Sequence, residues 1–155
     1  MSEVHTGGCQ CGAVRYRASK LGRASICHCR MCQKAFGGFF GPLVTGEDIE
    51  WTRGERARFQ SSNKNWRGFC RDCGTPLTYE HADGIELAIG SLDNPDRAAP
   101  VAQTNVAHKR AFFDDLTSIP PVGVEEMDGH DAYNATIKSN QHPDHDTDSW
   151  PEDNR

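Results

Sequence analysis

The seven cysteines constrain this chain of 155 residues more than any other feature. All of them lie in the first 73 residues, in three short clusters: Cys9-Gln10-Cys11, Cys27-His28-Cys29-Arg30-Met31-Cys32 and Cys70-Arg71-Asp72-Cys73. In a reducing compartment, clustered cysteines point to metal binding or catalysis rather than to disulfides, and an odd number cannot pair completely. We therefore expect the clusters to be metal ligands, with separate buried thiols as the alternative.

Ligand counting suggests how the cysteines divide. A structural zinc takes four protein ligands in a tetrahedron, whereas a catalytic zinc takes three and keeps one position open. If the residues of each cluster bind the same ion, two divisions are possible. Either the three-cysteine cluster joins one of the two-cysteine clusters in a site of five and leaves the other pair over, or the two pairs form a site of four. Only the second division leaves a site of three. It assigns Cys9, Cys11, Cys70 and Cys73 to a structural zinc and Cys27, Cys29 and Cys32 to a catalytic zinc, so that two Zn²⁺ are expected per chain.

The three-cysteine cluster is expected at the start of a short helix. The sequence predicts this helix from Cys29 to Ala35 or Phe36, ended by Gly37-Gly38. A helix N-terminus lowers thiol pKa, so three thiolates can converge on one ion there. Three thiolates and Zn²⁺ carry a net charge of −1, which favours holding a fourth, exchangeable sulfur over generating hydroxide. The alternative is a second structural zinc completed by a histidine: His28, His5, His81 or His108.

The rest of the chain predicts a mainly antiparallel β domain. With 36 % hydrophobic residues, 15 Gly and 8 Pro, a bundle of long helices is disfavoured. Short apolar or alternating segments separated by turn residues are typical of strands. The expected strands are residues 13–18, 39–44, 58–61, 76–80, 85–89 and 101–106.

Charge divides the chain at Val122. From Gly123 to Arg155 there are nine acidic and two basic residues, a net charge of −7, whereas the first 122 residues hold 13 acidic and 15 basic residues, a net charge of +2. We expect a zinc-binding β domain over residues 1–122 and an acidic, flexible tail over 123–155. His130, His142 and His145 are expected to be solvated, with Tyr133 and Trp150 as candidate anchors of the tail. The charge also argues against a nucleic-acid partner.

No segment reaches the roughly 20 apolar residues of a membrane span. The first residues, Met1-Ser2-Glu3-Val4-His5, lack the basic and apolar regions of a signal peptide. We therefore expect a cytoplasmic protein with no membrane partner.

The clusters and their neighbours resemble the glutathione-dependent formaldehyde-activating enzyme family, also called GFA or the CENP-V/GFA domain. The segments that carry the resemblance are Gly8–Tyr16, Cys27–Lys34, Gly68–Leu77 and Gly90-Ser91-Leu92-Asp93. The resemblance covers roughly residues 5–118 and implies a β-rich, Mss4-like fold with two zinc ions. It also implies the same division of the cysteines into a structural four and a catalytic three.

The resemblance implies a carbon–sulfur lyase that reversibly joins glutathione and formaldehyde to S-(hydroxymethyl)glutathione. Its partners would be a small thiol and an aldehyde, with glutathione as co-substrate. Arg30, Lys34, Arg67 and Lys64 are candidate clamps for the glutathione carboxylates, and Arg67 or backbone N–H groups of residues 29–34 are candidate oxyanion donors. Phe36, Phe39 and Phe40 are candidate pocket walls. The alternative function is a non-enzymatic, zinc-stabilised module of Mss4-like fold that binds a protein.

Overall fold

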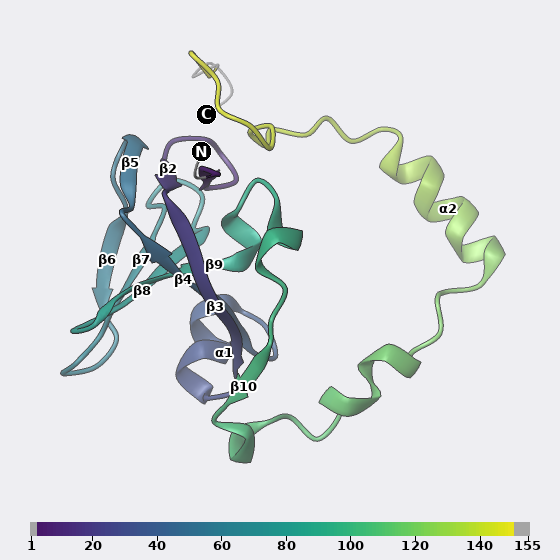
Figure 1. Ribbon diagram of the computed structural model, residues 1–155. Coiled ribbons are helices and arrows are strands. Elements are labelled where there is room, and N and C mark those ends of the chain that lie inside the picture. The colour runs from purple at the N-terminus through teal and green to yellow at the C-terminus, as the bar shows by residue number, and fades with distance from the viewer. Residues whose placement is uncertain (1–2, 151–155) are drawn as a thin grey trace.

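Ten β-strands in two sheets form the body of the protein, shown in Figure 1 as a computed structural model in which residues 3–150 are described. The strands are β1 (His5–Gly8), β2 (Arg15–Ala18), β3 (Lys20–Cys27), β4 (Gly41–Glu47), β5 (Glu50–Arg53), β6 (Ala57–Gln60), β7 (Trp66–Phe69), β8 (Pro76–His81), β9 (Gly84–Ala88) and β10 (Ala102–Thr104). The helices are α1 (Arg30–Phe36) and α2 (Val124–Asn134), with short 3-10 helices η1 (Ile89–Ser91), η2 (Pro95–Ala98), η3 (Val106–His108) and η4 (Phe113–Ser118). The predicted mainly β fold with few short helices is confirmed.

The larger sheet has seven strands in the order β10-β3-β4-β9-β8-β7-β6, and the smaller has three in the order β1-β2-β5. Neighbouring strands are antiparallel except β10, which pairs parallel to β3 with Thr104 opposite Cys27. The chain leaves β9, the central strand of this sheet, and passes through η1 and η2 to β10, the edge strand beside β3. This crossover brings the residues after Thr104 to the end of β3, beside Cys27.

Every predicted strand is present, within a few residues of its expected bounds, but β1, β3, β5 and β7 were not predicted. β1 has the sequence His-Thr-Gly-Gly, and β3 contains Gly22 and charged residues, so neither shows a clear hydrophobic alternation. Both become strands through pairing, β1 with β2 and β3 with β4. The hydrophobic pattern thus predicted the strands whose own sequence is apolar or alternating. It missed strands such as β1 and β3, which form through pairing with a neighbouring strand.

The two sheets share one core. Tyr16 and Val14 from the β2 segment are buried together with Val44, Leu77 and Leu87 of the larger sheet. The hydroxyl of Tyr16 lies 2.7 Å from Oγ of Ser91, which satisfies the polar end of this buried ring. The core therefore holds the β1–β2 loop against the larger sheet.

Helix α1 begins and ends as the sequence predicts. Cys29 is the N-cap, with its sulfur accepting the backbone N–H of Cys32 at 3.3 Å. Gly37 ends the helix in the left-handed conformation, with φ of 61°. The cap places Cys29 and Cys32 on the same side of the first turn.

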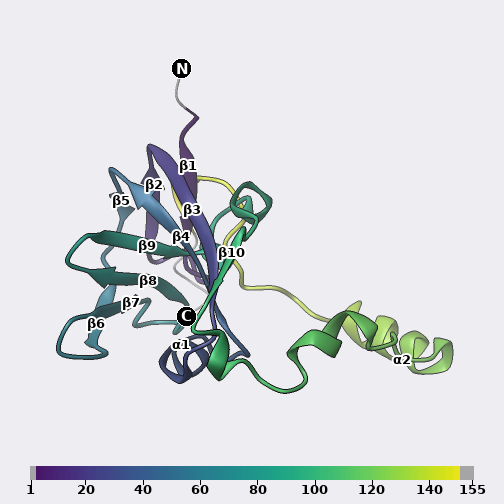
Figure 2. The same ribbon diagram turned by 60° about the horizontal axis from the view of Figure 1, so that its bottom comes forward.

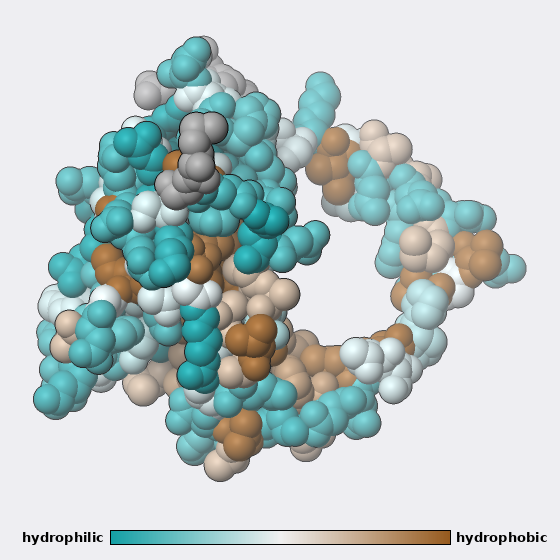
Figure 3. Space-filling model, viewed as in Figure 1, coloured by the Kyte–Doolittle hydropathy of each residue, from teal (hydrophilic) through white to brown (hydrophobic). Residues whose placement is uncertain are grey.

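The chain beyond β10 forms a wide arc that leaves the body and returns to it, as Figures 1 and 2 show. In the space-filling view of Figure 3, an opening separates this arc from the body. The arc contains α2, which was not predicted and which is exposed along its whole length. Glu125 and Glu126 lie in its first turn, where they interact favourably with the helix dipole.

The end of the arc contacts the body through residues that were expected to be solvated. His142 is buried, and its backbone N–H donates to the carbonyl oxygen of Gln10 at 2.8 Å. The expectation of a solvated side chain was therefore wrong for His142, because the tail packs it against the β1–β2 loop. Of the candidate anchors, Tyr133 is exposed, and the ring of Trp150 lies 4.8 Å from that of His142.

Residues 151–155 of the predicted tail lie outside the described residues. The division at Val122 and the flexibility of the tail stay predictions. Within residues 3–150, no helix combines the length and apolar character needed to cross a bilayer.

Candidate metal centres

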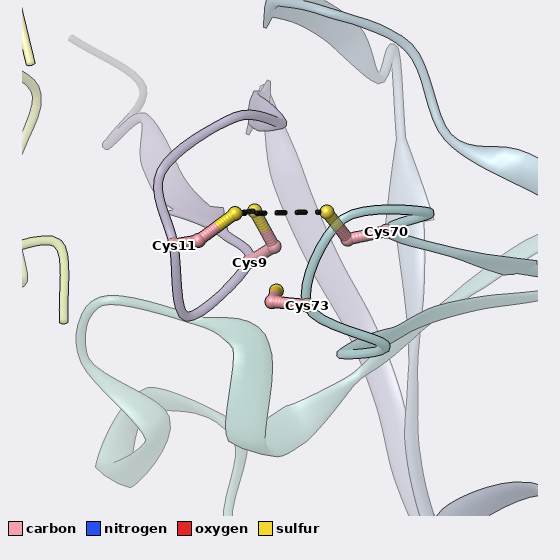
Figure 4. A group of neighbouring side chains, drawn as sticks. All are labelled: Cys9, Cys11, Cys70 and Cys73. Atoms are coloured by element: carbon pink, nitrogen blue, oxygen red, sulfur yellow. Dashed lines mark hydrogen bonds between the residues drawn. The ribbon is translucent and has the colours of Figure 1, made fainter. Parts of the chain in front are cut away.

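Four cysteine sulfurs from two distant turns meet beside the β1–β2 loop. Cys9 and Cys11 lie in this loop, and Cys70 and Cys73 lie in the turn between β7 and β8 (Figure 4). The four sulfurs are all within 4.8 Å of one another; Cys9 and Cys11 are 3.6 Å apart, and Cys11 and Cys70 are 3.8 Å apart. The structure thus brings together the four residues that ligand counting grouped.

A tight turn in each of the two segments brings these sulfurs close together. The backbone N–H of Gly74 donates to the carbonyl of Cys70 at 2.8 Å, and Gly74 adopts φ of 77°. In the β1–β2 loop, Gly12 donates to the carbonyl of Cys9 at 3.1 Å and adopts φ of 74°. Both glycines follow a cysteine directly and allow a left-handed turn that other residues adopt only with strain.

The four-sulfur cluster fits a tetrahedral zinc. Zn–S bonds of about 2.3 Å place the sulfurs of a tetrahedron about 3.8 Å apart, close to the separations found here. A disulfide needs a separation of about 2.05 Å, and all seven cysteines are free thiols. Burial raises the pKa of the Cys9 thiol. Burial also acts to raise the pKa of Cys73, but hydrogen bonds with Thr75 and Cys11 together outweigh it and lower that pKa to about 6.

The second cluster lies where β3 meets α1. Cys27 is the last residue of β3, Cys29 caps α1 and Cys32 lies in its first turn. Their three sulfurs are within 4.8 Å of one another, and among residues 3–150 no His, Asp or Glu completes the set. The donor set is therefore three thiols, which fits zinc with one coordination position left for an outside ligand.

Cys27 and Cys32 form a closely coupled pair. The hydrogen bond with Cys32 lowers the pKa of Cys27 to about 4, and the same bond raises the pKa of Cys32. The guanidinium of Arg67 opposes this second effect, with Nη2 lying 3.3 Å from the Cys32 sulfur. The pair thus favours negative charge on Cys27 over Cys32.

His28 does not join the cluster, although it lies between Cys27 and Cys29 in sequence. Its side chain is fully buried, Nε2 lies 2.8 Å from Oε1 of Gln103, and its ring packs edge-on against Phe113. His5, His81 and His108, the other candidates for a fourth ligand, are also outside the set of converging groups in the described residues. His28 instead contacts Gln103 of β10 and Phe113 of η4.

A cavity of about 410 Å³ opens beside the three-cysteine cluster. It is lined by Arg30, Met31, Lys34, Ala35, Phe59, Ser61 and Arg67. Three of the four cations predicted to bind substrate carboxylates, Arg30, Lys34 and Arg67, therefore line one cavity, and Arg67 also contacts the Cys32 sulfur. Lys64 does not line it.

The predicted aromatic walls are placed differently. Phe36 lines the adjoining smaller cavity, whereas Phe39 and Phe40 pack edge-on against Phe112 and Phe113. Phe59, from the edge strand β6, supplies the exposed aromatic wall instead and is 63 % exposed.

Sequence reasoning missed one neighbour of the cluster, Asn105. Its Nδ2 lies 3.3 Å from the Cys27 sulfur, and its backbone is left-handed with φ of 54°. Asn in a short polar segment after a strand is typical of a turn. Only the parallel pairing of β10 with β3 brings this turn to Cys27.

Comparisons with known proteins give the family of the chain and a structure of similar fold. Residues 4–108 match the family model described as glutathione-dependent formaldehyde-activating enzyme. The chain is similar in fold to a Rhodobacter sphaeroides protein of known crystal structure, with a TM-score of 0.50 and 23 % sequence identity, over 64 % of this chain and 99 % of that one. No curated protein matched the chain.

Proposed function

Because the chain belongs to the glutathione-dependent formaldehyde-activating enzyme family, we propose that it is a zinc-dependent carbon–sulfur lyase acting on the adduct of a thiol and an aldehyde. Glutathione and formaldehyde are the first pair to test, with S-(hydroxymethyl)glutathione as the adduct. The observation that carries the proposal is the convergence of Cys27, Cys29 and Cys32, without a fourth protein ligand among residues 3–150, beside a cationic cavity. A reducing cytoplasm would keep these thiols available.

We assign the two clusters different tasks. Cys9, Cys11, Cys70 and Cys73 would hold a structural zinc, since four ligands leave no position for substrate. Such a site contributes on the order of 10–16 kcal/mol of apparent binding energy, comparable to the stability of a whole domain. Cys27, Cys29 and Cys32 would hold the catalytic zinc, which supplies a position for the substrate thiol and lowers the pKa of that thiol.

The cavity residues would bind the remainder of the thiol substrate. Glutathione carries two carboxylates, and Arg30 and Lys34 lie on one side of α1 facing the same cavity. Arg67 lines the same cavity and also contacts the Cys32 sulfur. A thiol without carboxylates would lose these ionic contacts and bind more weakly.

The reaction needs no oxidant or reductant. In the direction of addition, the substrate sulfur forms a bond to the carbonyl carbon, the carbonyl π bond breaks, and the thiol proton ends on the new hydroxyl oxygen. In the reverse direction, the carbon–sulfur bond breaks and the hydroxyl proton returns to sulfur. Arg67 and the backbone N–H groups of the first turn of α1 are the available donors for the oxygen while it carries negative charge.

The test is a titration of the zinc-loaded protein with glutathione and formaldehyde, following adduct by NMR and zinc with a chromophoric chelator. We expect faster formation of S-(hydroxymethyl)glutathione than in buffer. Because Lys34 is exposed, the Lys34→Ala variant should raise the half-saturating glutathione concentration about two- to fivefold, as expected for the loss of one exposed ion pair. The matched control is Lys64→Ala, which removes a lysine that does not line the cavity and should leave the value unchanged.

The same titration also tests the alternative function, a non-enzymatic module that binds a protein. Two equally inert zinc ions, with no effect of glutathione on either and no catalysis, would contradict the lyase proposal and favour the module.

A further inference from the structure

Each sulfur of the three-cysteine cluster accepts a hydrogen bond from a nitrogen of the protein. Nδ2 of Asn105 lies 3.3 Å from Cys27, Nη2 of Arg67 lies 3.3 Å from Cys32, and the backbone N–H of Cys32 lies 3.3 Å from Cys29. A hydrogen bond to a thiolate stabilises its charge, and a more stable thiolate is a weaker nucleophile. The cluster is thus surrounded by groups that reduce the reactivity of its own sulfurs.

Asn105 reaches Cys27 because of an unusual backbone conformation. Its φ of 54° places it in the left-handed region directly after β10, where Asn is tolerated better than most residues. The side chain is exposed, so this donor lies at the solvent side of the cluster. One other non-glycine residue among residues 3–150, Asp48, has a positive φ, of 48°, in the turn between β4 and β5.

Arg67 approaches Cys32 from the interior. Its side chain is buried, its Nε donates to Oγ of Ser61 at 3.1 Å, and its guanidinium carbon lies 4.9 Å from the centre of the Tyr79 ring. These contacts hold the guanidinium in place. Its Nη1 is buried without a hydrogen-bond partner in the described structure. An oxygen atom of a bound molecule that lies next to Nη1 would accept a hydrogen bond from it.

We propose that Asn105 and Arg67 are positioning residues that keep Cys27 and Cys32 as unreactive ligands, so that the entering substrate sulfur attacks the aldehyde. This inference rests on the proposed function. If the aldehyde reacted with Cys27 or Cys32, the carbon–sulfur bond would form to a cysteine of the protein instead of to the substrate. That cysteine would then be modified and lost as a zinc ligand. Donors on the resident sulfurs disfavour that addition without hindering the substrate thiol.

The test measures the alkylation of each cysteine in the full-length, zinc-loaded protein with iodoacetamide, by mass spectrometry of peptides and their fragments. Asn105→Asp keeps the shape of the side chain but lacks the N–H donor, and Asn105→Gly adopts a positive φ without strain but has no side chain. Both should raise the alkylation rate of Cys27 about two- to tenfold, as expected for one lost hydrogen bond, and leave Cys29 unchanged. Asp48→Gly is the matched control for a relieved left-handed residue and should change neither rate.

A spectroscopic measurement separates positioning from a structural role. With Co²⁺ in place of zinc, the loss of an N–H···S bond raises the energy of the sulfur electrons, so the sulfur-to-metal charge-transfer band should move to longer wavelength in both Asn105 variants. Arg67→Met should shift the same band and raise the alkylation rate of Cys32 rather than that of Cys27.

Equal alkylation in wild type and Asn105 variants, or a uniform increase at all three cysteines, would overturn the inference. So would an Asp48→Gly effect as large as that of Asn105→Gly. The outcome is independent of catalysis, because a protein that forms no adduct can still show selective protection of Cys27. Failure of the proposed function and failure of this inference are therefore distinguishable.

Discussion

Arg15 and Asp146, which lie 131 residues apart, form an ion pair with 2.7 Å between Nη2 and Oδ1. Arg15 is buried and also binds both carboxylate oxygens of Asp93, at 2.8 and 2.5 Å. It begins β2, directly after the loop that carries Cys9 and Cys11. The ion pair therefore ties the acidic tail to the part of the body that presents half of the four-cysteine cluster.

Loss of this ion pair should loosen the tail. Asp146→Asn keeps the size of the side chain but removes its charge, which should cost about 1 kcal/mol because Asp146 is half exposed and Arg15 retains Asp93. In a chain of this size the melting temperature should fall by about 2–4 °C in calorimetry. The exposed Asp148 lies two residues further on, so Asp148→Asn is the control. Equal effects of both substitutions would mean that the tail responds only to net charge.

Docking of the tail should weaken in mild acid because of His142. Its Nε2 lies 3.2 Å from Nη1 of Arg53, and its Nδ1 lies 2.7 Å from the carbonyl oxygen of Pro143, so the ring fits as a neutral donor at Nδ1 and acceptor at Nε2. Burial lowers the pKa of His142, and the charges of Arg15 and Arg53 lower it further, against the opposing charge of Asp93 and the bond to Pro143.

A folded-state pKa below the unfolded value of about 6.5 means that the neutral ring stabilises the fold above that pH. This stabilisation is lost as the pH falls through the folded-state pKa. The difference in melting temperature between wild type and His142→Ala should therefore shrink from pH 8 to pH 5. His145→Ala, which changes an exposed histidine of the same segment, should give a small difference at every pH. Parallel pH curves for wild type and His142→Ala would contradict the prediction.

Two glycines with similar backbones should respond differently to substitution. Gly12 and Gly74 have φ of 74° and 77°, so alanine at either site costs about 1–2 kcal/mol of backbone strain. A Cβ at Gly12 would also lie 2.5 Å from Cδ2 of His142, whereas a Cβ at Gly74 meets nothing within 4 Å.

We therefore expect Gly12→Ala to displace the tail and expose it to limited proteolysis, and Gly74→Ala to lower the melting temperature without this effect. Equal protease sensitivity of the two variants would show that the contact between His142 and Gly12 does not hold the tail.

The two cysteine clusters should differ in their effect on folding. Cys73→Ser removes a ligand from a cluster that joins the β1–β2 loop to the β7–β8 turn, and we expect unfolded or insoluble protein. Cys29→Ser removes a ligand from a cluster confined to the end of β3 and the start of α1, and we expect a folded protein that has lost one zinc. Metal analysis and circular dichroism check both outcomes. Similar folding defects in the two variants would contradict the division into structural and catalytic sites.

Much of the local structure around the two cysteine clusters could be predicted from short segments of sequence. The Cys-x-x-Cys-Gly turn, the helix starting at Cys29 and its end at Gly37 depend on neighbours in the chain, and the structure forms each of them as expected. The number of cysteines in each cluster also comes from the sequence. Counting them as ligands divided the seven sulfurs into the same groups of four and three that lie together in the structure.

The remaining features depend on contacts between distant segments. Strands β1 and β3 form because partners pair with them, and Asn105 reaches Cys27 because β10 pairs in parallel with β3 at the edge of the larger sheet. The composition of the tail predicts exposure, and α2 is exposed, but His142 becomes buried because the backbone of Gln10 and the guanidinium of Arg53 satisfy its polar groups.

The sequence by itself thus determined the residue types, the spacing of the ligands and the local turns, because these follow from the chemistry and conformational preferences of adjacent residues. Only the tertiary structure decided which groups donate to the sulfurs, which cations line the cavity and where the tail binds. Those features depend on distances between residues far apart in the chain, and the energy of a hydrogen bond or an ion pair depends on such distances.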